Sequence, residues 1–189
     1  MRAIPIGGRH VTLELMKRIR TLHPVLADLT EAEANDIKEK HCYCTSSSVH
    51  SPVYSGGKDV LIRGVYYRLD DVLHQACEVL FSPVPSDTRD SDLKTQYSLS
   101  IESLEHNRPV PLVRNAVVLV GATTLLPGYV QRFHDTVQSL YADTSQWTVK
   151  AMLERNYASW LGGSILGSLS CCHNFFVTKE QLATRLGLD

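Results

Sequence analysis

The sequence predicts an α/β fold, and three observations favour it. The first is a wholly apolar run, Val117 to Val120, that passes through small residues into a helix-period segment ending near Phe133. The second is that stretches with helical spacing alternate with a few short strand-like runs. The third is composition: 43% of the 189 residues are apolar and 21% are charged, as in an ordinary globular protein that buries one core or two small ones.

The N-terminal residues predict a strand end, a tight turn and a first helix. Ala3 to Ile6 is a short apolar run, and the glycines Gly7 and Gly8 after it predict the turn. The apolar residues that follow recur at helical spacing until Pro24, which ends this helix; they are Val11, Leu15, Ile19 and Leu22.

A second helix is predicted up to about Lys40. Thr30 and Glu33 have the spacing of a capping box, in which each side chain satisfies a backbone N–H at the start of a helix. The segment HCYC that follows is predicted to be extended.

The middle of the chain predicts a hairpin between loops. Residues 45–58 and 82–92 are rich in Ser, Gly, Pro or Asp and are expected to be loops. Between them, residues 60–69 contain the alternation and the β-branched and aromatic residues of a strand or hairpin, and residues 70–80 are expected to be helical.

The C-terminal half predicts helices around short strands. Ser91 can cap a helix that contains Leu93 and Leu104, and residues 116–120 are expected to be a buried strand. Pro127 and Gly128 open a helix whose apolar stripe ends at Leu140. A short strand is expected over 147–151, and helices are expected over 159–169 and 178–186.

Charge and apolar runs exclude two classes of partner. The 19 Lys and Arg residues balance 20 Asp and Glu residues, so the sequence has no excess positive charge for a nucleic-acid backbone. No apolar run reaches the roughly 18 to 20 residues that span a bilayer, and the start has no signal-peptide core. We expect no nucleic-acid contact, no membrane and a cytosolic or nuclear protein.

The five cysteines are predicted to be reduced, buried or half-buried thiols. Their number is odd and their spacing is not that of a disulfide framework. A metal site is the weaker alternative because C-x-C and C-C are not the C-x2-C pairs that wrap zinc; its candidate ligands are Cys42, Cys44, Cys171, His41 and His173.

The turn after the apolar strand is a candidate ligand site. Small residues between a strand and a helix let backbone amides approach a phosphate or a nucleoside, and Gly121 allows φ angles that other residues resist. Close packing alone explains such turns in most proteins, so from these residues a nucleotide site is only a hypothesis.

Four motifs in the same order resemble the second half of an actin or actin-related protein. They are IPIGGR, DIKEKHCYC, ATTLLPG and SWLGGSILGSL, and the resemblance covers most of residues 3–180. It implies the carboxyl-side lobe of the actin-like ATPase (ribonuclease H-like) fold. Residues 1–8 and 93–157 would form its third subdomain, residues 9–92 its fourth, and residues 158–189 helices that pack on the first subdomain.

The resemblance also implies a residual nucleotide site for ATP or ADP. Lys38 and Glu39 match the family's pair beside the ribose, and Thr123 follows the family's glycine turn. In that turn Gly121 keeps the first glycine, whereas Ala122 replaces the second. Asn156 stands where the family has a lysine near the adenine.

Catalysis is not expected. The family's two glycine-rich phosphate hairpins would precede Met1, and the chain contains no D-x-G hairpin, so metal ligands and water-orienting side chains have no candidates. His74 could be paired with Asp70, Asp71 or Cys77, but these residues are expected to lie on a helix surface without a catalytic role. The Gly162–Ser164 segment is expected to serve close packing of helices.

Within the family the motifs are most similar to divergent actin-related proteins, particularly the type at the pointed end of the dynactin filament. The implied function is a structural subunit that binds dynactin-type partners in the cytoplasm, for dynein transport along microtubules. The alternatives are a nucleotide-binding fragment of an actin-fold ATPase and a nuclear, chromatin-remodelling subunit.

The C-terminal helices carry a large apolar surface, expected either to fold back on the third subdomain or to be covered by another chain. A chain that is part of a longer polypeptide would leave the same surface. Its members are Trp160, Leu161, Ile165, Leu166, Phe175 and Phe176.

Overall fold

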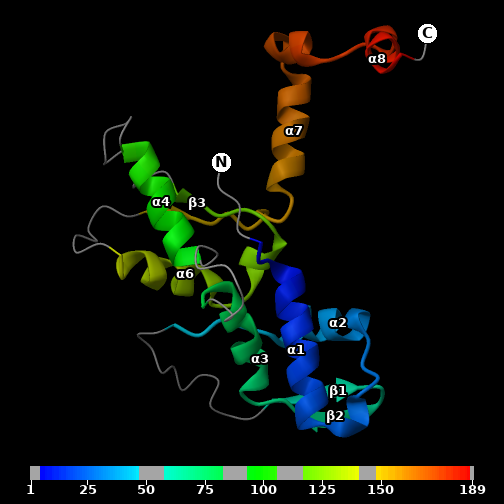
Figure 1. Cartoon of the computed structure of the whole chain (residues 1–189), viewed down its shortest axis with the longest axis vertical. Helices are drawn as coiled ribbons and strands as arrows, with labels where there is room; N and C mark the ends of the chain where they lie inside the picture. The colour runs from blue at the N-terminus through cyan, green and yellow to red at the C-terminus, as the bar shows by residue number, and fades with distance from the viewer. Residues whose placement is uncertain (1–4, 47–57, 83–92, 106–116, 141–147, 188–189) are drawn as a thin grey trace.

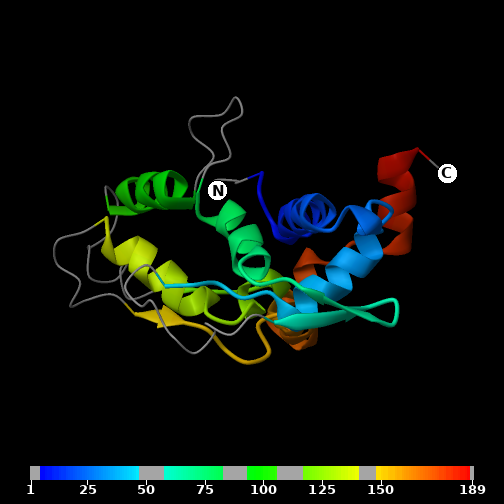
Figure 2. The same cartoon turned by 90° about the horizontal axis from the view of Figure 1, so that it is seen from below.

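The structure is a computed structural model that describes residues 5–46, 58–82, 93–105, 117–140 and 148–187. Two units lie side by side in both views (Figures 1 and 2), and a C-terminal arm extends from them. The helical unit contains α1 (Gly8–Leu22), η1 (Pro24–Leu26), α2 (Glu31–His41), β1 (Asp59–Ile62), β2 (Val65–Arg68), α3 (Val72–Gln75) and η3 (Ala76–Leu80). The sheet unit contains α4 (Leu93–Glu105), β3 (Val117–Val118), η4 (Ala122–Leu125), α6 (Tyr129–Gln138) and β4 (Val149–Lys150), and the arm contains α7 (Ala158–Ser168), η5 (Ser170–Phe175) and α8 (Lys179–Leu186).

Helix α1 is confirmed, but the tight turn predicted before it is wrong. Gly7 is the extended N-cap residue and Gly8 is already helical. The Gly7 N–H donates to His10 Nδ1 at 3.1 Å, and the Gly7 carbonyl accepts from the His10 N–H at 2.9 Å. These bonds satisfy backbone groups that a helix start leaves open, so the glycines begin the helix.

The core of the helical unit is the apolar face of α1 packed against α2, η1 and η3, and the inward side chains of β1 belong to the same core. Val11, Leu15 and Ile19 have no exposed surface, as their spacing predicts. The capping box of α2 is confirmed: the Thr30 hydroxyl accepts from the Glu33 N–H, and the Glu33 carboxylate accepts from the Thr30 N–H.

The predicted hairpin is confirmed as the antiparallel pair β1–β2. Its turn residues Arg63 and Gly64 both have positive φ angles, 51° and 83°, which is the geometry of a two-residue hairpin turn. The Arg63 guanidinium binds carboxylates of Asp28 at 2.8 Å and Glu33 at 2.6 Å, so the turn is tied to the residues around the start of α2.

In the sheet unit the predicted strand is shorter and less buried than expected. Only Val117 and Val118 form β3, which pairs in parallel with β4. Val118 is 51% exposed and Val120 50% exposed, whereas Leu119 is buried. Among the described residues only β4 pairs with this strand. The exposed valines show that one face of the strand is not packed against other elements, whereas strands made of a continuous apolar run are usually buried on both faces.

Contacts between α6 and the helical unit join the two units. The Cys44 N–H donates to the Pro127 carbonyl at 2.7 Å, and Arg132 pairs with Glu78 of η3 at 2.7 Å. Gly128 has a φ of 79° and lies so close to the Cys44 carbonyl that a Cβ atom there would be 2.1 Å from its oxygen. The junction therefore requires glycine at this position.

The C-terminal arm is uncovered. Figure 1 shows α7 projecting away from the two units, with η5 and α8 beyond it. No residue of α7 is buried, and Trp160 is 71% exposed. Of the two alternatives expected for this surface, the one in which the helices fold back on the third subdomain is therefore wrong. Across the part of the chain that the structure describes, no helix has both the length and the apolar character needed to cross a bilayer.

Candidate functional site

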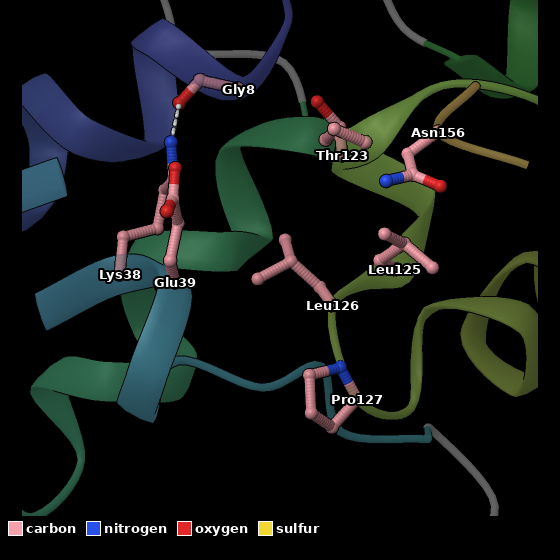
Figure 3. Close-up of a pocket in the computed structure, with 9 residues that line it drawn as sticks. Gly8, Lys38, Glu39, Thr123, Leu125, Leu126, Pro127 and Asn156 are labelled. Atoms are coloured by element: carbon pink, nitrogen blue, oxygen red, sulfur yellow. Dashed lines mark hydrogen bonds between the residues drawn. The ribbon is translucent and has the colours of Figure 1, made fainter. Parts of the chain in front are cut away.

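A cavity of about 340 Å³ lies where the two units meet. Figure 3 shows Gly8, Lys38 and Glu39 on one side and the turn after β3 on the other. This volume is within the range of small-molecule sites, about 300 to 1,000 Å³. The lining residues are Gly8, Lys38, Glu39, Ala122, Thr123, Leu125, Leu126, Pro127 and Asn156.

The cavity brings together residues that are far apart in the sequence. Lys38 and Glu39 come from α2, Ala122 and Thr123 from η4, and Asn156 from the segment before α7. All of these residues are candidates named above from the resemblance, so the fold gathers them at one place. Their binding of a nucleotide stays a prediction.

Gly121, the remaining candidate, is not among the lining residues. It has a φ of 95°, an angle that glycine adopts at little cost. Its carbonyl accepts from the N–H and the hydroxyl of Thr124, at 3.1 and 2.8 Å. Gly121 therefore shapes the turn that presents Ala122 and Thr123 to the cavity.

Lys38 is half-buried rather than solvated. Its Nζ donates to Asn35 Oδ1 at 2.6 Å, to Thr12 Oγ1 at 3.0 Å and to the Gly8 carbonyl at 3.4 Å. These three acceptors hold the ammonium group in place. Lys38 is therefore not a solvated surface residue, whereas Glu39 is exposed.

The two units approach each other closely beside Lys38. A Cβ atom on Gly8 would lie 2.8 Å from Thr123 Oγ1 and 3.8 Å from Lys38 Nζ. Gly8 therefore lets α1 and η4 meet at the rim of the cavity, a role that the sequence analysis did not assign to it.

Three further polar residues support the site, and their roles were not predicted from the sequence. Asn35 and Thr12 hold Lys38. Arg155 braces the turn: its Nε donates to the Thr124 hydroxyl and its Nη2 to the Thr124 carbonyl, both at 3.0 Å. The spacing of Asn35 from the pair, three and four residues, was an available signal because such residues share one helix face.

The lining suits a ligand with a flat apolar part and several hydroxyl groups. Leu125, Leu126 and Pro127 form an apolar wall, and Lys38 with Glu39 forms a polar one. This chemistry fits the nucleoside part of a nucleotide. Within the described ranges no three His, Cys, Asp or Glu side chains are arranged to hold a metal ion.

All cysteines except the exposed Cys171 are buried or half-buried as predicted, whereas the buried Cys77 does not lie on a helix surface as expected for its pairing with His74. Cys42, Cys44 and Cys77 are buried free thiols, while Cys171 is exposed. Asp70 pairs with Arg68 at 2.9 Å rather than with a histidine. The Cys77 thiol faces the carbonyl of Leu73 at 3.6 Å, within its own helical turn, as expected for a structural cysteine.

The chain is similar to known proteins over most of its length. The family model described as Actin matches residues 17–183. Centractin of Schizosaccharomyces pombe is 33% identical over 184 residues, which are 93% of this chain and 48% of that protein. Centractin of Saccharomyces cerevisiae is 29% identical over 190 residues, 96% of this chain and 49% of that protein. The chain thus spans about half the length of the curated relatives it matches.

Proposed function

Because the chain belongs to the actin family, we propose that it is a non-catalytic structural subunit that binds proteins at the end of an actin-like filament. The complex we propose is of the dynactin type, which supports dynein transport along microtubules, with a cytoplasmic, cytoskeletal location. Within the family, the pointed-end type is our finer proposal.

The uncovered C-terminal arm is the observation that carries this proposal. Trp160 is 71% exposed, Phe175 82% and Ile165 60%. From Asn156 to Thr178 the sequence contains no Asp, Glu, Lys or Arg. An apolar surface of this kind, on a helix with no buried face, is typical of a surface covered by another protein or by another part of a longer polypeptide, and we propose that a protein partner covers it.

The two units support the proposed subdomain division. We assign residues 1–8 and 93–157 to the third actin subdomain and residues 9–92 to the fourth. The arm, residues 158–189, corresponds to helices that pack on the first subdomain. In this arrangement the junction at Gly128 joins the third and fourth subdomains, and the cavity lies between them.

Recovery of partners from cells tests the main proposal. The tagged chain is expected to copurify with dynactin subunits, identified by mass spectrometry. A variant with Trp160→Glu and Phe175→Glu is expected to lose them, because a charge cannot be buried unpaired at an apolar interface. The matched control is Tyr66→Glu, another exposed aromatic residue, on the hairpin.

Each other result is informative. Recovery of chromatin-remodelling subunits would instead favour the alternative function, a nuclear subunit of a chromatin-remodelling complex. If the double glutamate variant recovers the same dynactin subunits as the unsubstituted chain, the arm is not the docking surface and the proposal loses its support.

A second candidate function is residual binding of ATP or ADP in the cavity. The observation that favours it is the meeting of Lys38, Glu39, Thr123 and Asn156 around one cavity. Calorimetric titration of the chain with ATP and Mg²⁺ tests this function. Micromolar affinity would favour a nucleotide-binding lobe of an actin-fold ATPase, and no heat of binding at millimolar ATP would refute it.

A further inference from the structure

We propose that Asn35 is the positioning residue of the cavity: its side-chain amide holds Lys38 and Glu39 together in the orientation that a ligand meets. This inference rests on the second proposed function, the binding of a nucleoside-containing ligand. Asn35 is not a lining residue, so its effect on a ligand is exerted through its two neighbours.

The position of Asn35 on α2 allows one side chain to reach both residues. Lys38 follows it by three residues and Glu39 by four, so all three lie on one side of the helix. Successive residues of a helix diverge by about 100°, and the side chains of Lys38 and Glu39 therefore do not face each other. A residue one turn earlier can bridge them.

The hydrogen bonds show that Asn35 makes this bridge. Its Oδ1 accepts from Lys38 Nζ at 2.6 Å, and its Nδ2 donates to Glu39 Oε1 at 2.8 Å. An ammonium group only donates and a carboxylate only accepts, so the chemistry fixes which way the amide points. Both bonds involve a charged group, and such bonds are stronger than those between neutral groups.

The other partners of Lys38 make Asn35 the principal restraint. The bonds to Thr12 and to the Gly8 carbonyl are longer, 3.0 and 3.4 Å. The exposed carboxylate of Glu39 has its one described side-chain hydrogen bond with Asn35. Loss of the Asn35 amide therefore frees Glu39 to rotate and removes the shortest bond to Lys38.

Binding measurements on paired variants test the inference. Asn35→Ala removes both bonds, and we expect it to weaken ATP binding by calorimetry roughly tenfold, the effect of one or two charge-assisted bonds. Asn35→Asp keeps the acceptor for Lys38 but places a second carboxylate beside Glu39, and should weaken binding at least as much. The control, Asp36→Asn, removes an exposed ion pair with Lys40 on the same helix and should change affinity less than twofold.

A double-mutant cycle distinguishes positioning from general destabilisation. Because Asn35 acts through Lys38 as well as through Glu39, Asn35→Ala should have a smaller effect in a Lys38→Met background than in the natural chain, and the remaining effect is the part that passes through Glu39. Additive effects of the two substitutions would overturn the inference. Thermal unfolding of each variant in the absence of ligand identifies any that has lost its fold.

A ligand-free measurement separates failure of this inference from failure of the proposed ligand. At low temperature the ¹⁵Nζ–¹H NMR signal of Lys38 should be visible because its protons are held by acceptors. The loss of one signal in Lys38→Arg identifies that signal as the one from Lys38. The signal should disappear in Asn35→Ala and persist in Asp36→Asn. If it persists in Asn35→Ala, Asn35 does not hold Lys38 and the inference is wrong, whatever binds. If ATP, ADP and adenosine all fail to bind the natural chain, the proposed ligand is wrong and the inferred effect on ligand binding falls with it, while the NMR result still decides what holds Lys38.

Discussion

Substitution of Gly128 by alanine tests the junction between the two units. Gly128 immediately precedes α6 and follows Pro127, whose carbonyl accepts from the Cys44 N–H at 2.7 Å. An alanine Cβ would lie 2.1 Å from the Cys44 carbonyl oxygen, while contacts of Cβ atoms below 3.0 Å essentially never occur. The clash is with backbone, so rotation of a side chain cannot relieve it.

The expected loss of stability is the sum of two contributions. Alanine in the left-handed region costs about 1 to 2 kcal/mol. Relieving the clash moves the segment around the buried Cys44 by about an ångström and breaks its bond to Pro127, and an unsatisfied buried backbone group costs about 1 to 3 kcal/mol. We expect Gly128→Ala to lower the free energy of unfolding by about 3 to 4 kcal/mol, a large part of the roughly 5 to 15 kcal/mol that holds a domain together.

Urea unfolding followed by circular dichroism measures this loss, and two other glycines provide controls. Gly64 has a φ of 83° but an added Cβ meets nothing within 4 Å, so Gly64→Ala should show only the conformational cost. Gly163 lies within α7 without a positive φ, so its substitution should be neutral or stabilising by up to about 1 kcal/mol. If Gly128→Ala and Gly64→Ala lower stability equally, with equal urea dependence, the junction is not tight and the reasoning fails.

Three more predictions follow from the burial and charge of named residues. Leu15→Ala, at a side chain with no exposed surface, should lower the free energy of unfolding by about 3 kcal/mol in the same assay; a loss below about 1 kcal/mol would contradict its place in the core. Hydrogen bonds from Arg63, and then from Thr30, lower the pKa of Glu33 from 4.5 to about 2, so the stability they provide is present above pH 4.5 and is lost as the pH falls toward 2. Carboxyl NMR titration of Arg63→Ala should show the pKa of Glu33 raised, and a value still near 2 would refute the pairing. With a thiol reagent, the native chain should react quickly at Cys171 and Cys172 and only on unfolding at the buried thiols Cys42, Cys44 and Cys77, whereas five fast thiols would be contrary to their burial.

Elements whose signals are local were predictable from the sequence. The capping box of Thr30 and Glu33 depends only on residues three apart, and it forms as predicted. The apolar stripe of α1 and the hairpin β1–β2 were also predictable, because apolar residues recur there at the spacing of a helix and of a strand. The family and its actin-like fold class were also predicted, from four motifs in order, and both are confirmed.

Features that depend on distant partners were not predictable in this way. The valines around β3 predict a buried strand, yet burial depends on neighbouring strands that the local sequence does not specify. Gly7 and Gly8 begin α1 because His10 satisfies the Gly7 N–H, a contact that turn statistics do not capture. Of the cavity, five lining residues were predicted through the resemblance: Lys38, Glu39, Ala122, Thr123 and Asn156. Thr12 and Arg155 were missed because their roles appear only when distant segments meet, whereas Asn35 was missed although its spacing on α2 was an available signal.

The stretch from Asn156 to Thr178, which contains no Asp, Glu, Lys or Arg, bears on the amount of the protein that a cell can maintain. Under the function proposed above, this stretch stays exposed until a partner covers it, and exposed apolar helices are what chaperones and quality-control proteases recognise. The steady-state amount of the protein should then follow the supply of its partner rather than its own synthesis. Depletion of the partner would shorten its half-life, and overproduction of the chain alone would yield mostly degraded or insoluble material.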